Sequence, residues 1–264
     1  MTLLLEGIYR RYGFDFRQFA RATLRRRILE RVREEGARCV SGLQEILLRD
    51  GEVFERFVTA VTLGAGGLFG HPQSDRGFRT VVAPALRQKK RPRVWQVGCS
   101  TGEELYSTAV LLQEEDLADQ TLVYATDLHD APLRQAAMGA FPLASLREAE
   151  ARYRAAGGRG SLADYYKVAG ERGVFRSELR RNVLFASHNY MTDASFNEFD
   201  VVLCRDLLPE LSPGLQQRVH GLLYDSLASG GYLLLGREEG VGPTPFAAGY
   251  ETVDARRGLF RKTA

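Results

Sequence analysis

The sequence predicts an α/β fold, in which a helical N-terminal region precedes a mainly parallel sheet with helices on both faces. No strand-like alternation appears before Val61. After residue 92, by contrast, short apolar runs rich in β-branched or aromatic residues recur between turn residues. Helix-like stretches separate several of these runs, and strands that alternate with helices are typical of a parallel sheet covered on both faces.

The N-terminal 60 residues carry helical periodicity. Two apolar stripes recur at helical spacing: Leu24, Ile28 and Val32, and a second set from Leu43 to Val61 that Gly51 interrupts. The glycine-rich stretch "GAGGLFGHP", which ends at Pro72, predicts a loop, and "RQKKRP" at 87–92 predicts a charged linker. We therefore place a helical domain at 1–72, a linker at 73–92 and a second domain at 93–264.

The second domain has strand and helix signals in alternation. The expected parallel strands are "RVWQVG", "TLVYAT", "NVLFAS", "DVVLC" and "GYLLLG", and the expected helices are 103–115, 131–139 and 214–228. The C-terminal "YETVDARRGLFRK" predicts a strand pair around a charged turn. The irregular stretch 140–181 contains "DYYKVAGERGVFRSE", which can form a small antiparallel insert.

Composition restricts the class of protein. The chain has 264 residues and a formal charge of +3, and no apolar run approaches the roughly 20 residues that a membrane span needs. Its three cysteines are widely spaced, which favours a reducing cytoplasm and packed roles for Cys99 and Cys204 rather than disulfides or a zinc site. Since the four histidines form no ligand-like pair, we expect no metal.

An arginine-rich segment lies between Arg21 and Glu35, where there are six arginines and three glutamates. Two interpretations remain open at this stage. One is a solvated helix face with i,i+4 ion pairs, and the other is a docking surface for an acidic partner. Basic residues are not interleaved with aromatic ones as single-strand nucleic-acid binders require, so we expect no nucleic-acid partner.

A turn spelled Gly98-Cys99-Ser100-Thr101-Gly102 follows the first expected strand. It fits a hydrolase nucleophile elbow with Ser100 as nucleophile, and it fits a glycine turn that lets backbone approach a nucleotide-like cofactor. A hydrolase elbow follows a central strand after several others have formed, whereas this strand is the first. His220 lies in the middle of an expected helix, where a triad histidine is poorly placed. The order therefore favours the cofactor turn.

The next expected strand ends at Asp127, about 25 residues after the turn. A carboxylate at that position can accept hydrogen bonds from both ribose hydroxyls, or it can cap a helix. Because "GCSTGEE" has no third glycine, an adenosyl cofactor without phosphates fits better than a dinucleotide. His129 is expected to face solvent.

Several longer motifs resemble the CheR family of chemotaxis receptor methyltransferases. In chain order they are "LRRRILERV", "VWQVGCSTGEELYS", "ATDLHDAPLRQAAMGAF", "FDVVLCRDLL" and "GGYLLLGREE", and they cover nearly the whole chain. The resemblance implies an all-helical N-terminal domain, a Rossmann-like class I methyltransferase sheet and a small β-subdomain at about 160–181. It also implies that S-adenosylmethionine donates a methyl group to glutamates in the cytoplasmic helices of chemoreceptors, leaving S-adenosylhomocysteine.

The resemblance also assigns residues by position. Cofactor contacts are implied at Glu103, Asp127 (on the ribose) and Asn189, with further contact positions at Tyr190, Asp206 and Leu207, beside Gly98 in the turn. Tyr190 replaces a usual leucine and Asp206 a usual asparagine. The basic helix matches the element that grips the acidic receptor bundle, which favours docking roles for Arg25, Arg26, Arg27 and Arg31. No catalytic residue is assigned.

The chain departs from the family in one loop. An amide, a hydroxyl and a guanidinium that line the family pocket are replaced by Gly64, Gly66 and Gly70, and a family tyrosine is replaced by Glu210. An acidic Glu210 would repel an incoming carboxylate unless it is protonated or turned away. Two functions are therefore carried forward: an active cytoplasmic protein-glutamate O-methyltransferase, expected to be a monomer without membrane insertion, and a catalytically impaired module that docks receptors or S-adenosylhomocysteine.

Overall fold

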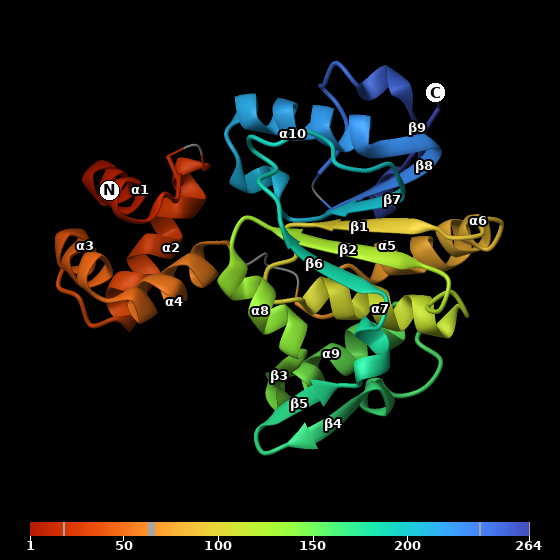
Figure 1. Cartoon of the computed structure of the whole chain (residues 1–264), viewed down its shortest axis with the longest axis horizontal. Coiled ribbons are helices and arrows are strands. Elements are labelled where there is room, and N and C mark those ends of the chain that lie inside the picture. Colours follow the sequence, from red (N-terminus) through yellow and green to blue (C-terminus); the bar gives the residue numbers. More distant parts are fainter. Residues whose placement is uncertain (18, 63–66, 238, 264) are drawn as a thin grey trace. The chain divides into compact units, whose positions relative to one another are not determined.

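The computed structural model describes residues 1–17, 19–62, 67–237 and 239–263 (Figure 1). The chain divides into two compact units. The first comprises Met1–Leu63 with Pro209–Gln216, and the second comprises Gly64–Leu208 with Gln217–Ala264. The division confirms a helical N-terminal unit, and it adds to that unit a short segment from the C-terminal half of the chain.

In the described N-terminal residues of the first unit the helices are α1 (Thr2–Tyr12), α2 (Arg21–Glu34), α3 (Val40–Arg49) and α4 (Gly51–Thr62). The expected break is confirmed, since α4 begins at Gly51. The apolar stripes meet in one core, formed by Leu4, Ile8, Leu24, Ile28, Leu43, Leu47, Phe54 and Phe57, all buried. The segment 209–216 joins this unit through an antiparallel bridge between Phe19 and Leu211.

The second unit contains a seven-stranded sheet of order β6-β2-β1-β7-β8-β10-β9. Its strands are β1 (Arg93–Val97), β2 (Leu122–Asp127), β6 (Val183–Ser187), β7 (Phe199–Cys204), β8 (Leu227–Leu235), β9 (Tyr250–Asp254) and β10 (Leu259–Lys262). The first five named are parallel, whereas β10 pairs antiparallel with both β8 and β9. The expected parallel strands and the C-terminal strand pair are thus confirmed.

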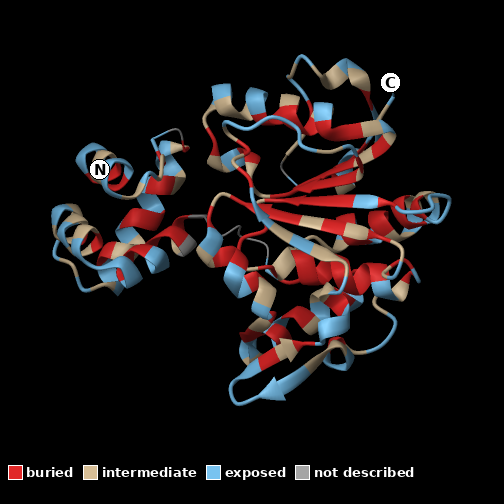
Figure 2. Cartoon of the chain, in the orientation of Figure 1, coloured by how far each residue is buried: buried red, intermediate tan, exposed pale blue. Residues whose placement is uncertain are grey.

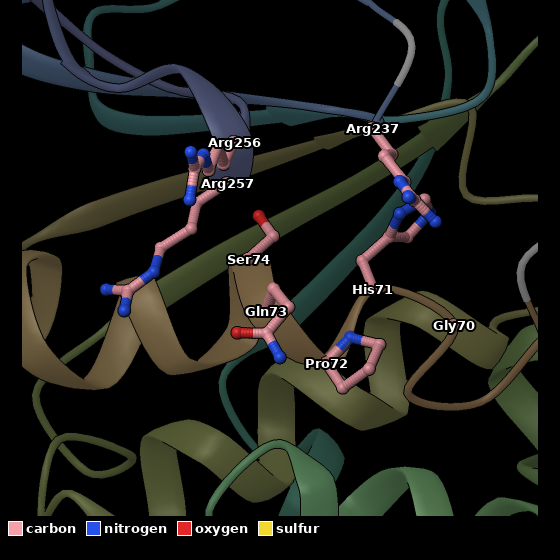
Figure 3. A pocket seen from close by; sticks show the side chains of 8 residues that line it. All are labelled: Gly70, His71, Pro72, Gln73, Ser74, Arg237, Arg256 and Arg257. Carbon is pink, nitrogen blue, oxygen red and sulfur yellow. The ribbon is translucent and has the colours of Figure 1, made fainter.

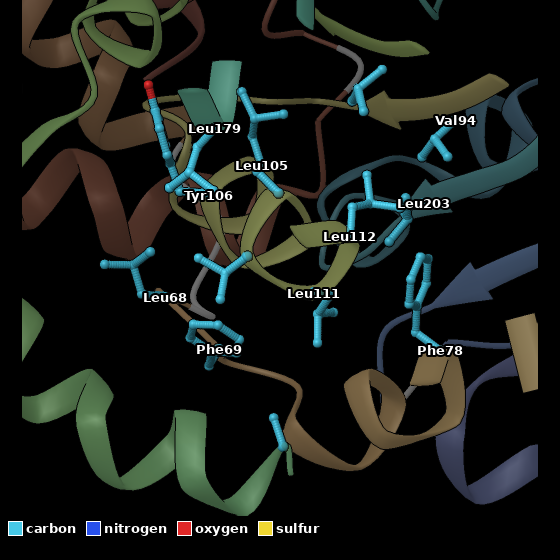
Figure 4. Packing of buried hydrophobic residues seen from close by; sticks show 14 of the residues in the cluster. Leu68, Phe69, Phe78, Val94, Leu105, Tyr106, Leu111, Leu112, Leu179 and Leu203 are labelled. Atoms are coloured by element: carbon cyan, nitrogen blue, oxygen red, sulfur yellow. The ribbon is translucent and has the colours of Figure 1, made fainter. Parts of the chain in front are cut away.

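Helices cover both faces of this sheet. In Figure 1, α7 (Glu103–Glu114) and α8 (Asp130–Met138) lie on one face and α10 (Pro213–Ser226) on the other. Figure 2 shows the central strands buried along most of their length. Figure 4 shows the apolar packing around α7, where Leu112 lies beside Leu203; Leu105 and Val94 belong to the same buried cluster.

The segment 73–92, expected to be a linker, is mostly helical in the structure. Most of it forms α5 (Pro72–Gly77), a π-helical turn (Phe78–Val82) and α6 (Ala83–Leu86). Phe78, Val82 and Leu86 are buried in the core of the second unit. These apolar residues recur at helical spacing, so the segment has the pattern of a packed helix, and only the charged residues after it resemble a linker.

The small antiparallel insert is confirmed and is larger than expected. Its sheet has the order β3-β5-β4, with β3 (Ala140–Pro142), β4 (Tyr166–Ala169) and β5 (Arg172–Phe175). Helix α9 (Leu143–Ala155) follows β3. The remaining elements are short 3₁₀ turns at Leu162–Tyr165, Ser177–Arg180, Leu208–Glu210, Ala247–Gly249 and Ala255–Arg257. The sequence located the β4–β5 hairpin but not the three-residue strand β3, which is too short to show alternation.

Candidate functional site

The implied cofactor residues of the second unit follow four neighbouring parallel strands. Gly98 follows β1, Asp127 ends β2, Asn189 follows β6, and Asp206 with Leu207 follows β7. These strands are adjacent in the order β6-β2-β1-β7. Because the carboxyl ends of parallel strands meet at one edge of a sheet, the structure brings these residues to the edge where ligands bind in open α/β folds.

The turn after β1 needs glycine at both ends. Gly98 has φ +66° and Gly102 has φ +96°, in the region that side chains rarely adopt. A Cβ on Gly102 would also lie 2.9 Å from the Cβ of Ala136, which shows how closely α7 and α8 approach. A Cβ on Gly98 would meet only the side chain of Leu207, at 3.8 Å. The backbone at Gly98 is therefore the part of the turn that a ligand can approach closely.

Asp127 fixes this turn from the end of β2. Its Oδ2 accepts the Ser100 N–H at 2.8 Å, and its Oδ1 accepts the His129 N–H at 3.2 Å. Burial raises the pKa of Asp127 to about 6, against these backbone hydrogen bonds, which lower it. Since α8 begins at Asp130 with His129 as its N-cap residue, Asp127 does not cap the helix. The capping interpretation is wrong, and the carboxylate keeps free lone pairs for a ligand hydroxyl.

Ser100 has the position of a nucleophile without the groups that activate one. Its hydroxyl is buried, and no residue in the described part of the chain hydrogen-bonds to it. A serine nucleophile needs a general base, most often a histidine, within hydrogen-bond reach of its hydroxyl. The structure thus agrees with the sequence order in disfavouring a hydrolase.

Glu104 and Arg205 form a buried ionic network that the sequence analysis did not assign. Arg205 Nη1 lies 2.9 Å from Asp75 Oδ1 and 3.0 Å from Glu104 Oε1, and its side chain is 2% exposed. Gln96 Nε2 donates to Glu104 Oε2 at 2.7 Å. Burial raises the pKa of Glu104, and the charge of Arg205 opposes that rise. The network joins α5, β1, α7 and the end of β7 beneath the candidate site.

Glu103, by contrast, lies at the half-exposed start of α7. The Thr101 hydroxyl donates to its carboxylate at 2.7 Å. Two adjacent glutamates therefore have different surroundings: Glu103 remains available to a ligand, whereas Glu104 is committed to Arg205. The doubled glutamate after a glycine turn, together with an arginine directly after a strand, is the signal that could have revealed this network.

The segment after β6 positions Asn189 and Tyr190. His188 N donates to the Asp127 backbone carbonyl at 3.0 Å, which ties the segment to the end of β2. The Asn189 side-chain oxygen accepts the Met191 N–H at 3.0 Å, and the half-exposed side chain remains at the surface of the site. Tyr190 is buried. Asn189 is therefore partly accessible at the end of β6, whereas Tyr190 is not.

Asp206 is held in a left-handed conformation by two neighbours. Its φ is +60°, and its Oδ2 lies 3.0 Å from His71 Nε2. Burial lowers the pKa of His71, but the Asp206 hydrogen bond and nearby carboxylates outweigh that effect, so the pKa is raised overall. Glu239 accepts the backbone N–H groups of Asp206 and Leu208, at 3.0 and 2.9 Å. Glu239 therefore holds the segment that carries Asp206 and Leu207.

Glu239 makes stability depend on pH. Burial raises its pKa from 4.5 to about 7. Between these values the folded state keeps a proton that the unfolded state has lost, so stability falls as pH rises from 4.5 to 7 and is level above. The fall attributable to Glu239 is about 3 kcal/mol. Urea denaturation from pH 4.5 to pH 8 measures it, as the difference between the wild type and Glu239→Gln. Parallel curves for the two proteins would contradict this assignment.

Cys99 and Cys204 lie at the same edge of the sheet as the candidate site, but their side chains are packed in the interior. Both are buried, at 3% and 0% exposure, and burial raises their thiol pKa values well above the ordinary value. Neither thiol is poised as a nucleophile, which confirms the packed role. His129, expected to face solvent, is instead buried, and burial lowers its pKa to about 4. That expectation is wrong.

The arginines of α2 divide into two groups in the first unit. Arg25 and Arg26 are exposed, whereas Arg27 is buried and donates to Glu210 Oε1 at 2.8 Å and to the Val61 carbonyl. The Arg31 side chain is 11% exposed and pairs with Glu34 and Glu35. Arg27 therefore cannot belong to an exposed docking face, and Arg31 is largely committed within its own unit. These two assignments are corrected.

The ion pair with Arg27 shows whether Glu210 could repel an incoming carboxylate. Its side chain is 18% exposed and its charge is neutralised within the first unit by Arg27. Glu210 is thus turned toward a guanidinium. Gly70 is described and half-buried, while Gly64 and Gly66 lie outside the described residues.

Removing Glu210 is expected to destabilise the first unit. Glu210→Ala leaves a guanidinium with 8% side-chain exposure without its carboxylate, so the free energy of unfolding should fall by about 3 kcal/mol. The matched control is Glu30→Ala, which removes the partner of exposed Arg26 and should cost at most about 1 kcal/mol. Chemical denaturation followed by circular dichroism measures both. Equal losses in the two variants would show that the buried ion pair contributes no more to the free energy of unfolding than the exposed one.

The residues at this edge fit an adenosyl cofactor without phosphates. The turn from Gly98 to Glu103 contains no lysine or arginine, and the carboxylates of Glu103 and Asp127 flank it. Such a site repels a pyrophosphate but accommodates a cationic sulfonium. The open lone pairs of Asp127 and the buried Ser100 hydroxyl are groups that can bind a sugar. Among the described residues no cluster could hold a metal ion, and no helix is long and apolar enough to cross a bilayer.

Comparison with known proteins gives matches over both units. Residues 1–62 match the family described as "CheR methyltransferase, all-alpha domain", and residues 69–252 match "CheR methyltransferase, SAM binding domain". The chain is 40% identical over 263 residues to the "Putative methyltransferase Cher3" of Pseudomonas putida, covering 100% of this chain and 96% of that protein. It is 25% identical over 234 residues to a "Chemotaxis protein methyltransferase" of Listeria innocua, covering 88% and 86%. It is 26% identical over 235 residues to "Chemotaxis protein methyltransferase 1" of Pseudomonas aeruginosa, covering 83% and 82%.

Proposed function

The chain belongs to the CheR methyltransferase family, which uses S-adenosylmethionine, and from this premise we propose that it methylates glutamate side chains on the cytoplasmic helical bundle of a chemoreceptor. The observation that carries the proposal is the meeting of Gly98, Asp127, Asn189 and Asp206 at one sheet edge. A receptor bundle of this kind lies in the cytoplasm, so the proposal places the protein there.

Methyl transfer to a carboxylate requires the protein mainly to position the two reactants. Bound S-adenosylmethionine supplies a methyl group attached to a positively charged sulfur. A glutamate carboxylate, with a reference pKa of about 4.3, is already ionised and needs no general base. Its oxygen would form a bond to the methyl carbon as the carbon–sulfur bond breaks, which would give a methyl ester and a neutral thioether without proton transfer. Catalysis then depends on orientation and on excluding water from the nucleophile.

The residues of the candidate site would share the task of binding. Asp127 would accept the ribose hydroxyls, and Gly98 would let the backbone approach. Asn189, Asp206 and Leu207 would contact the ligand from the ends of β6 and β7. Glu239 and the Arg205 network hold these segments in place. Rigid support of this kind is what an in-line displacement requires.

A second function is favoured by Gly70. A residue without a side chain stands where the family has a guanidinium, so one group that orients the reactants is missing. The loss of hydrogen bonds to a charged group weakens binding or orientation by roughly 1.5–3 kcal/mol each. A chain that binds receptors or S-adenosylhomocysteine without turnover is therefore the alternative.

Transfer of labelled methyl groups separates the two functions. The chain is incubated with S-adenosylmethionine labelled in the methyl group and with receptor cytoplasmic fragments. The active enzyme deposits label that dilute base releases, because glutamate methyl esters hydrolyse readily. Label that resists base would contradict a carboxyl ester. No label, with S-adenosylhomocysteine binding detected by calorimetry, would establish the binding module instead.

Receptor docking is expected to use the exposed side of α2. Arg21 and Arg25 are exposed there, whereas Arg27 and Arg31 lie on the buried side of the helix. Arg21→Glu combined with Arg25→Glu should weaken receptor-fragment binding at least tenfold, since like charges then face an acidic bundle. The control pair is Arg10→Glu with Arg49→Glu, at exposed arginines of α1 and α3. Equal weakening in both pairs, measured by pull-down titration, would exclude a specific α2 surface.

A further inference from the structure

A basic pocket lies beside the candidate site, within the second unit. It has a volume of about 670 Å³, which falls in the range of small-molecule sites. Its lining residues are Gly70, His71, Pro72, Gln73, Ser74, Arg237, Arg256 and Arg257. Figure 3 shows Arg256 and Arg257 entering the view from one side and Arg237 from the other, with Gln73 and Ser74 between them.

The pocket carries positive charge without matching negative charge. None of its lining residues in the described ranges is acidic. Arg237 and Arg256 are exposed, and their guanidinium groups make no hydrogen bond or ion pair with any residue that the structure describes. Arg257 is the exception, since its Nε lies 3.2 Å from Asp254 Oδ2. A concave surface lined by one sign of charge concentrates ions of the opposite sign.

The backbone behind the arginines is firmly held. Asp254 Oδ1 accepts the N–H groups of Arg256 and Arg257, at 3.0 and 3.3 Å. Gly258 follows with φ +62°, and a Cβ there would lie 2.3 Å from the Leu235 carbonyl oxygen. The β9–β10 turn therefore packs directly against the end of β8, two residues before Arg237. The backbone that carries Arg256 and Arg257 is therefore fixed, whereas ordering each exposed arginine side chain on binding costs about 0.5–1.5 kcal/mol.

His71 connects this pocket to the candidate cofactor site. It lines the pocket, and its Nε2 also contacts Asp206 at 3.0 Å. Gln73 and the buried Ser74 add neutral hydrogen-bonding groups between the arginines. Planar guanidinium groups bind carboxylates and phosphates in a bidentate manner. The set of donors is suited to a ligand with several oxygen atoms and more than one negative charge.

We propose that this pocket is a binding site for a small polyvalent oxyanion, either a phosphoryl compound or a polycarboxylate, and that it adjoins the methyl-transfer site at Gly70 and His71. One charge would be held between Arg237 and Arg256, and His71 would place the bound anion one hydrogen bond away from Asp206. The inference does not need receptor methylation, since it concerns a ligand other than the cofactor and the acceptor.

Calorimetric titration of the full chain tests the proposal, with pyrophosphate, citrate and inorganic phosphate as probes and neither cofactor nor receptor present. Pyrophosphate or citrate should bind more tightly than inorganic phosphate, and the tighter of the two identifies the phosphoryl or carboxylate class. Arg237→Gln with Arg256→Gln should weaken binding by at least about tenfold. The control pair, Arg49→Gln with Arg261→Gln, removes the same charge outside the pocket and should change binding by no more than about twofold.

Three results would overturn the proposal. One is no heat with any of the anions at millimolar concentration, and another is equal weakening in the two pairs of variants. The third is binding that both pairs leave unchanged. The substituted arginines are exposed, so both variant proteins should fold, and circular dichroism verifies this. Because no methyl donor is present, failure here leaves the proposed transferase untouched, and failure of methyl transfer leaves this site untouched.

Discussion

Replacing Arg205 with methionine is expected to lower the free energy of unfolding by about 3–5 kcal/mol, the range for breaking a buried ion pair from one side. The guanidinium is 2% exposed and lies within 3.0 Å of carboxylate oxygens on both Asp75 and Glu104. Methionine has a similar volume but no charge, so two carboxylates would lose their counter-ion in a low-dielectric interior. Urea denaturation at neutral pH measures the loss.

Two further variants make that result interpretable. Arg205→Lys keeps the charge but lacks the planar fork, so its loss should be intermediate. Arg154→Met removes an arginine with 68% side-chain exposure that pairs with Glu150, and it should cost at most about 1 kcal/mol. If Arg205→Met cost no more than Arg154→Met, the buried network would not be what joins α5, α7 and β7.

Replacing Asp127 with asparagine is expected to weaken S-adenosylhomocysteine binding by about 10- to 100-fold, because hydrogen bonds to a charged acceptor are worth roughly 1.5–3 kcal/mol. The carboxylate already accepts N–H groups from Ser100 and His129, and asparagine offers one acceptor oxygen where aspartate offers two. The substitution thus removes a ribose acceptor and also loosens the turn. Calorimetry with S-adenosylhomocysteine measures the affinity.

Asp130→Asn is the matched control for that substitution. Asp130 begins α8 three residues later, and its carboxylate accepts the Ser187 hydroxyl at 2.7 Å rather than any group of the turn. It loses the same charge, so its affinity should stay close to that of the wild type. Circular dichroism establishes that Asp127→Asn remains folded at the temperature of the titration. Equal affinity for S-adenosylhomocysteine in the wild type and Asp127→Asn would show that Asp127 does not bind the ribose.

Much of the second unit could be predicted because strands and glycine turns are local signals. The runs that became β1, β2, β6, β7 and β8 are short, apolar and bounded by turn residues. Since parallel strands end at one edge, the residues that follow them could be expected to meet. Gly98 and Gly102 predicted the turn from local sequence, because few residues other than glycine adopt its backbone angles.

The α2 arginines show a different case, in which helical spacing does not separate the buried residues from the exposed ones. Arg27 lies three residues after Leu24, but Arg25 lies three residues before Ile28, so both arginines adjoin the apolar stripe. What the sequence could not supply is the partner, because Glu210 lies 183 residues further along the chain.

The basic pocket could not be predicted from the sequence because its residues, like Arg27 and Glu210, are far apart along the chain. His71, Arg237 and Arg256 come from three distant stretches, and only the packing of the β9–β10 turn beside β8 brings them together. The Arg205 network has the same character, since it unites Asp75, Glu104 and the end of β7. Charge pairs formed by tertiary packing leave no periodic trace in the chain.

A crystal structure of the chain grown with S-adenosylhomocysteine tests the proposed cofactor site most directly. We expect the ligand at the carboxyl ends of β1 and β2, with its ribose hydroxyls within hydrogen-bond distance of the Asp127 carboxylate and its adenosyl group over Gly98. An empty edge in crystals grown with saturating ligand, or a ribose bound by groups other than Asp127, would contradict it.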